Sequence, residues 1–433
     1  MRARSLAHAD AGLAHVGRGC GGDVADRDDR EADRCVPASA PAFRRVMAAV
    51  RPRLTVLMAA ATLFLPRPGC ADVVTVAQVL PFAGPAGLPT RAAADAAALY
   101  LRKVGQGRGV NGHVIRLVTV IAPRGLDAAF RRTAETLRRY RPVALLNVDG
   151  AARTLALLER GVLEASRTPV IGALVSATPV RAFAGNRWVF YIRPGLKAEA
   201  DHMAREGATA GRRRVAILYR DDASGEEGMG MATAALQGLG VRPVLRLPLA
   251  VGMMDAPSLD RLAETVLGAD ADVILCFADS LNIGGFLRAY RERGGHALIV
   301  TDSTPSAQAL VRASSTALAR GVRIAQPLPA PDGQRLQLTR AFAADMRAGG
   351  RPDLAASAEA LEGYVSARLF VEVLRRMRGP VTGEAVRTAL QTRGPFDLGG
   401  FEVNYGPSQY EGSQTVGIGV VGREGRLFNS LNN

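Results

Sequence analysis

The stretch VVTVAQVLPFAGPAGLPTRAAADAAALYLRKVGQGRGVNGHVIRLVTV, residues 73–120, decides the fold. Val73–Val79 is an uncharged, β-branched run that predicts a buried strand, and an alanine-rich helix is expected over Thr90–Val104. A second strand is expected over His113–Val120. The order strand, helix, strand predicts a parallel sheet with a right-handed crossover. Ligands bind beyond the carboxyl ends of the strands in such sheets, so the loop Leu80–Pro89 should face a site.

The same alternation continues along the rest of the chain. Helices are expected between short apolar runs, among them one over Thr154–Ser166, and a second series of strands and helices begins at Val215. The further strands are expected at Val143–Leu146, Pro169–Gly172, Val215–Leu218, Val244–Leu249, Val273–Phe277 and Leu298–Val300. This pattern predicts an α/β protein with doubly wound parallel sheets. The 433 residues, 48% of them hydrophobic, suffice for two or three domains.

The first part of the chain has a different character. Residues 1–46 are rich in Arg, Asp, Gly and Ala without periodicity, and we expect them to be disordered or to result from a start codon placed too early. Met47–Ala71 is typical of a signal peptide, because basic residues precede the apolar run Leu54–Leu65, which is too short to span a bilayer. We expect cleavage after Ala71. Lipid attachment at Cys70 is the alternative, although Arg67 stands where a lipobox has Leu.

The charge of the chain bears on nucleic-acid binding, and its cysteine content bears on disulfide bonds. Residues 72–433 contain 44 Lys/Arg and 33 Asp/Glu, a net charge of +11, and nearly all of the excess is arginine. The arginines are scattered over predicted helix surfaces without interleaved aromatic residues, so arginine usage typical of a GC-rich genome explains them better than nucleic-acid binding. Cys276 is the only cysteine well inside this region, so no disulfide within it is expected.

The decisive stretch also resembles a known family. The strand, the P-x-x-G-P loop from Pro81 to Pro85, the alanine-rich helix and Gly109-Val110-Asn111-Gly112 resemble the start of the leucine/isoleucine/valine-type periplasmic binding proteins of ABC transporters. Looser matches extend to roughly Phe428. The resemblance implies two doubly wound parallel-sheet lobes joined by a multi-strand hinge. It places lobe one at 72–193 and 326–405, and lobe two at 194–325 and 406–433.

The family also implies site residues in lobe one. Gly150 and Ala151 fall where the family uses backbone amides and a serine for the α-carboxylate of an amino acid, although that serine is absent here. Free N–H groups at a helix N-terminus suit a carboxylate. Leu174 and Ser176 lie just past the next strand, and by resemblance Ser176 takes the place of a hydroxyl donor to the same end of the ligand. An ordinary loop or capping role for Ser176 is the alternative.

In lobe two, acidic residues follow successive predicted strands. Asp222, with Asp221 beside it, Asp279 and Asp302 would form an acidic wall suited to a ligand ammonium group. Aspartate at a strand-to-helix junction is also a favoured N-cap, which is the alternative for each of them. Asp302 lies near the family's ammonium-binding carboxylate. Ser224 replaces the aromatic residue of the family's D-x-x-Y-G pattern, so the pocket is altered and leucine itself is not the expected ligand.

Enzyme motifs are absent from the sequence. Gly105-x-Gly107-x-Gly109 follows a helix rather than a strand, and the five histidines show no metal-ligand spacing. We therefore expect no enzyme activity, no metal and no cofactor. The expected function is capture of a small amino-acid-like or amide-like solute in the periplasm by a monomer, which delivers it to an ABC permease and ATPase in the inner membrane. The alternative is a ligand-sensing module that feeds a receptor or regulator without transport.

Overall fold

The computed structural model describes residues 72–81, 88–107, 109–252 and 254–429. The expected disordered or mis-started residues 1–46, the predicted leader Met47–Ala71 with the lipid site at Cys70, and residues 82–87 of the predicted loop lie outside these ranges. Among the helices described, none combines the length and apolar character needed to cross a membrane.

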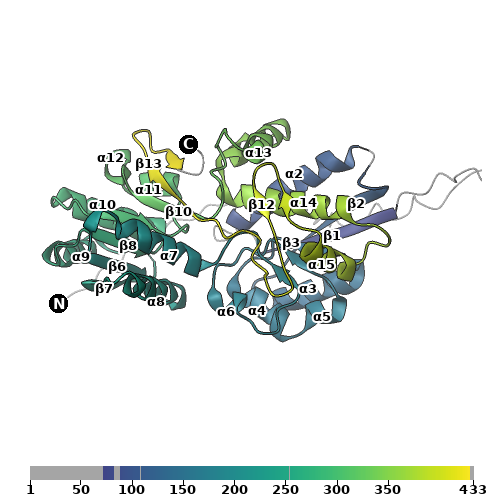
Figure 1. The fold of residues 1–433 in the computed structure, drawn as a ribbon, viewed down its shortest axis with the longest axis horizontal. Coiled ribbons are helices and arrows are strands. Elements are labelled where there is room, and N and C mark those ends of the chain that lie inside the picture. The colour runs from purple at the N-terminus through teal and green to yellow at the C-terminus, as the bar shows by residue number, and fades with distance from the viewer. Residues whose placement is uncertain (1–71, 82–87, 108, 253, 430–433) are drawn as a thin grey trace, which may run out of the picture. The chain divides into compact units, whose positions relative to one another are not determined.

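Lobe one is built around a five-stranded parallel sheet with the strand order β2-β1-β3-β4-β5 (Figure 1). Its strands are β1 (Asp72–Leu80), β2 (His113–Ile121), β3 (Ala144–Leu146), β4 (Val170–Ile171) and β5 (Val189–Phe190). The decisive stretch forms β1, helix α2 (Leu88–Gly105) and β2, with Asp72 beside His113 and Leu80 beside Ile121. The predicted strand–helix–strand unit is therefore confirmed.

Lobe two contains a seven-stranded sheet whose parallel part repeats this order. The sequence β7-β6-β8-β9-β10 is parallel throughout, and two antiparallel strands, β13 and β14, extend it. Its strands are β6 (Val215–Arg220), β7 (Leu245–Leu249), β8 (Val273–Phe277), β9 (Leu298–Thr301), β10 (Arg323–Gln326), β13 (Gly417–Val421) and β14 (Leu427–Asn429). Both sheets thus have one doubly wound topology, which confirms the predicted fold class.

Helices connect the strands, as their amphipathic patterns predict. In the described residues they are α3 (Leu126–Tyr140), α4 (Ala151–Glu159), α5 (Val162–Ser166), α6 (Thr178–Arg181), α7 (Leu196–Gly207), α8 (Ala223–Gly238), α9 (Ala256–Gly268), α10 (Ser280–Glu292), α11 (Ala307–Ala313), α12 (Thr316–Ala319), α13 (Gln337–Ala348), α14 (Ala358–Arg376) and α15 (Gly383–Thr392). The short strands β11 (Phe396–Asp397) and β12 (Glu402–Val403) pair with each other. The single helix predicted over 154–166 is interrupted at Gly161, whose φ is 64°.

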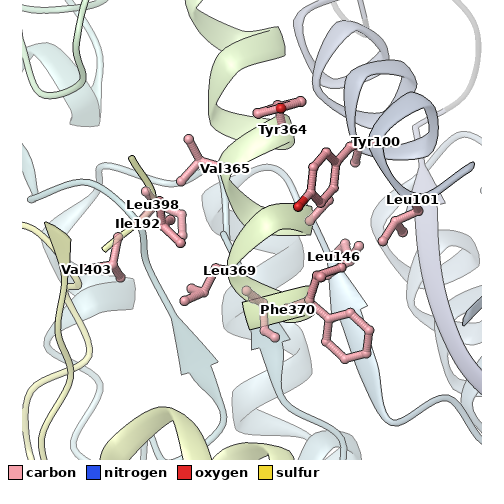
Figure 2. Close-up of a cluster of buried hydrophobic side chains, with 14 of the residues drawn as sticks. Tyr100, Leu101, Leu146, Ile192, Tyr364, Val365, Leu369, Phe370, Leu398 and Val403 are labelled. Atoms are coloured by element: carbon pink, nitrogen blue, oxygen red, sulfur yellow. The ribbon is translucent and has the colours of Figure 1, made fainter. Parts of the chain in front are cut away.

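Helix α14 is the centre of lobe one. Thirteen of its 19 residues are buried, so it is covered on nearly all sides rather than lying on the surface. It packs against α2 so closely that a Cβ on Gly363 would lie 2.0 Å from the carbonyl oxygen of Ala93. Tyr364 meets Tyr100 of α2 edge to face at 4.8 Å between ring centroids, in the cluster that Figure 2 shows. The C-terminal third of the chain therefore returns to complete the core of lobe one.

The chain passes between the two sheets after β5, after β10 and after β12. The first and third of these segments are hydrogen-bonded to each other. The amide of Tyr191 donates to the carbonyl of Tyr410 at 2.8 Å, and the amide of Ser413 donates to the carbonyl of Ile192 at 3.0 Å. The lobes are thus joined by several segments, as the predicted multi-strand hinge requires.

Candidate functional site

The carboxyl end of β3 leads directly into an uncapped helix N-terminus. Gly150, with φ at 81°, precedes α4, and no side chain accepts a hydrogen bond from the first N–H groups of this helix. The nearby carboxylate of Asp149 is held by Arg153 and by the hydroxyl of Thr90 at 2.9 Å. Because the acid is neutralised by Arg153, the free N–H groups at Gly150 and Ala151 keep their attraction for an anion.

The segment after β4 lies beside this helix start. Leu174 donates its amide to the carbonyl of Val148 at 2.8 Å and forms an isolated bridge with Asp149. Ser176 is half-buried, and its hydroxyl has no hydrogen-bond partner in the described structure, whereas its carbonyl accepts from the amide of Leu196 at 3.3 Å. The fold therefore brings the predicted residues Gly150, Ala151 and Leu174 to one edge of the sheet, with Ser176 two residues further along the chain.

In lobe two, the structure gives the predicted aspartates different local roles. Asp222 is the N-cap of α8, accepting from the amide of Gly225 at 3.0 Å, and it pairs with Arg220 at 2.6 Å. Asp279 is the N-cap of α10 and accepts from the amides of two residues in its first turn. Both residues perform the capping that the sequence left open, and their ligand roles stay predictions.

Asp302 is not a helix cap. It follows β9, is 7% exposed, and accepts a hydrogen bond at 2.5 Å from the hydroxyl of Thr304 through Oδ2. Its Oδ1 is buried without any hydrogen-bond partner. Burial, and then the negative charge of Glu199, raise the pKa of Asp302 to about 7. Of the three predicted aspartates, Asp302 alone therefore has a buried oxygen with no partner.

Asp302 belongs to a buried ionic cluster that the sequence did not predict. Arg193, at the crossing after β5, donates to Glu362 of α14 at 3.2 Å and to Glu199 of α7 at 3.3 Å. Glu199 also accepts from the amide of Ser303 at 2.8 Å. Burial raises the pKa of both glutamates, and the charge of Arg193 opposes that effect. The signal in the sequence that could have revealed this cluster is a glutamate among the buried residues of α7 and another among those of α14.

Two direct contacts join the edges of the lobes away from this cluster. The amide of Thr178, at the start of α6 in lobe one, donates to Oε1 of Glu227 on α8 at 2.6 Å. The hydroxyl of Thr178 lies 4.0 Å from the sulfur of Met231. Ser224 is exposed near the start of the same helix α8. The segment that follows Ser176 therefore contacts the lobe-two helix that carries Ser224.

The two sheets have the same strand order, and their lobes are joined by several segments and contact each other through α6 and α8. This arrangement defines a hinged two-lobe binding fold. The model of the family described as periplasmic binding protein matches residues 73–425, and the chain belongs to this family. The family consists of extracytoplasmic substrate-binding proteins of ABC transporters rather than enzymes. None of the curated proteins matches the chain.

Several solved structures have the same fold. A substrate-binding periplasmic protein from Ralstonia solanacearum is 29% identical, with a TM-score of 0.71 over 82% of this chain and 100% of that one. An extracellular ligand-binding receptor from Verminephrobacter eiseniae is 26% identical, with a TM-score of 0.73 over the same shares. A branched-chain amino acid ABC transporter protein from Thermus thermophilus with bound valine is 18% identical, with a TM-score of 0.71 over 83% of this chain and 95% of that one.

Proposed function

We propose that this protein is the periplasmic solute-binding component of an ABC importer and that it captures a small amino-acid-like solute between its lobes. The proposal rests on one observation, the opposite polarity of two unsatisfied groups. Lobe one offers the uncapped N-terminus of α4 at Gly150, and lobe two offers the buried, unpartnered Oδ1 of Asp302. A zwitterion complements this pair, since its carboxylate suits the helix N–H groups and its ammonium suits the aspartate.

The remaining predicted residues have subsidiary roles in this proposal. Ser176 would add a donor for the carboxylate through its free hydroxyl, and Leu174, whose amide already donates to Val148, would line the same edge at its bridge to Asp149. Asp222, Asp279 and Ser224 would line the lobe-two side. A solute that contacts both lobes stabilises the closed form only by its greater affinity for that form, so affinity is set by the closed state.

A bound ammonium also resolves an electrostatic problem of the free protein. The negative form of Asp302 is disfavoured by burial and by Glu199, and a cation next to Oδ1 would favour it. Binding of an amine should therefore release a proton below pH 7. Affinity should rise with pH, by up to about tenfold per pH unit, until Asp302 is ionised in the free protein.

The test is a calorimetric and thermal-shift screen of residues 72–433 against amino acids, their amides and aromatic acids. Valine is the first ligand to try, because the Thermus thermophilus protein of the same fold holds valine. Asp302→Asn should abolish the binding of any amine-bearing ligand. Glu292→Gln is the control for the loss of one negative charge, because Glu292 is exposed at the opposite end of α10 from Asp279 and its carboxylate has no partner in the described structure. Unchanged binding by Asp302→Asn would remove Asp302 from the site, and failure of every amine to bind would refute the zwitterion proposal.

A further inference from the structure

A cavity lies at the edge of the lobe-one sheet where its strands begin, opposite the edge that carries Gly150 and Leu174. It has a volume of about 920 Å³ and is lined by residues of α3, α5 and α15 and of the segments that lead into β3 and β4. These helices lie close together in Figure 1. Its residues precede the strands, whereas Gly150 and Leu174 follow them, so this cavity is separate from the site proposed above.

Three arginines line this cavity without charge partners. Arg138 lies in the last turn of α3, Arg141 follows α3, and Arg167 follows α5. All three are exposed, and within the described residues none of their guanidinium groups has a carboxylate or carbonyl partner. The one lining carboxylate, Glu384, is paired with Arg387. The lining therefore carries an uncompensated charge of about +3.

The partial charges at the helix ends do not cancel this positive charge. The C-terminus of a helix carries about half a negative charge and its N-terminus about half a positive one. The ends of α3 and α5 together supply about one negative charge, and the start of α15 returns half a positive charge. A net positive charge of about 2.5 remains at the cavity.

The backbone at two of these arginines is unusual. Arg141 and Arg167 adopt left-handed conformations, with φ of 43° and 51°, which residues other than glycine seldom adopt.

The inner wall of the cavity is apolar. Leu137 is 3% exposed, and Val143 and Val162 are half-buried beside it. The volume falls in the range of small-molecule sites, which are mostly apolar with a few placed polar groups. An inorganic anion would use only the arginines, and a neutral apolar molecule would leave the guanidinium groups unused. The combination of wall and charge selects a ligand with an apolar body and an anionic head.

We propose that this cavity is a binding site for a small amphiphilic organic anion, held by its head at Arg138, Arg141 and Arg167 and by its apolar body against Leu137, Val143 and Val162. A medium-chain carboxylate has this chemistry. The head forms charge-assisted hydrogen bonds with the guanidinium groups, and the chain removes apolar wall from water. This site acts independently of solute capture between the lobes.

The experiment measures binding of octanoate to residues 72–433 by isothermal titration calorimetry, with 1-octanol and inorganic phosphate as probes that each lack one feature. We expect octanoate to bind at least tenfold more tightly than either probe, and its affinity to fall as salt increases. The variant Arg138→Gln/Arg141→Gln/Arg167→Gln should lose octanoate affinity at least tenfold.

The matched control changes net charge equally at other exposed arginines. Arg131, Arg242 and Arg312 do not line the cavity, so their replacement by Gln should leave octanoate affinity within twofold of the original. Ala165→Glu adds a carboxylate to the cavity without removing an arginine, and it should weaken octanoate binding. This second variant tests the site even where the triple variant does not fold.

Three results would overturn the proposal. Octanoate affinity that survives both the triple variant and Ala165→Glu would place the ligand elsewhere. Phosphate binding as tight as octanoate binding would remove the role of the apolar wall. An equal loss of affinity in the control triple variant would reduce the effect to net charge.

Discussion

The buried carboxyl of Asp302 makes the stability of the protein depend on pH, and Asp302→Asn should remove this dependence. In the folded protein its pKa is raised from 3.8 to about 7, mainly by burial and then by Glu199. The charge of Arg193 and the hydrogen bond from Thr304 oppose this rise. Asparagine has nearly the same shape and does not titrate, so the variant isolates the ionisation of residue 302.

The sign follows from which state holds the proton. Between pH 3.8 and about 7, the unfolded chain has released the proton of Asp302 and the folded chain retains it. The folded state binds more protons, so the free energy of unfolding falls as pH rises through this window. The contribution is fully present below pH 3.8 and is lost once pH exceeds about 7. The interval between the two values corresponds to at most roughly 4 kcal/mol, at about 1.4 kcal/mol for each pH unit.

Urea unfolding at pH 4, 6 and 8 measures the effect. The difference in free energy of unfolding between Asp302→Asn and the unsubstituted protein should shift in favour of the variant from pH 4 to pH 8. The shift should be several kcal/mol, up to roughly 4 kcal/mol. Asp221→Asn, at an exposed aspartate, controls for the loss of one negative charge. A difference between Asp302→Asn and the unsubstituted protein that stays constant from pH 4 to pH 8 would refute the reasoning.

Two further predictions concern packing and the ionic cluster. Gly172→Ala should cost several kcal/mol, because its Cβ would lie 1.8 Å from Oγ of Ser366 in addition to the strain at φ 71°, whereas Gly211→Ala, at φ 76° with open space, should cost only about 1 kcal/mol. Comparison of the two urea midpoints tests this, and equal midpoints would mean that α14 moves aside freely. Arg193→Met should destabilise the protein by about 3 to 5 kcal/mol near neutral pH, since Glu362 and a second buried glutamate lose their cation. The loss should shrink at pH 4, where the glutamates accept protons, and a loss independent of pH would contradict an electrostatic cause.

The sequence predicted features that depend on neighbouring residues in the chain. The uncharged run before Leu80 and the alanine-rich helix after it gave β1 and α2 within two residues, because periodicity and turn residues act locally. The family motif at Gly109–Gly112 correctly identified the family. The break at Gly161 and the helix α15 were missed, since the local pattern allowed continuous helix in one case and gave no strong signal in the other.

The roles of the acidic residues were decided only by the tertiary structure. In sequence, Asp279 and Asp302 are alike, since each follows a buried apolar strand. In the fold, a helix begins directly after Asp279 and its amides take the carboxylate, whereas Asp302 is enclosed with Glu199 and the cluster around Arg193. Desolvation and the proximity of charges depend on contacts between segments more than 100 residues apart, such as the contact of Ser303 with Glu199. The local sequence does not show which distant residues come together. The strands and the family were thus determined by the sequence alone, and the tertiary structure decided which carboxylate is left unsatisfied.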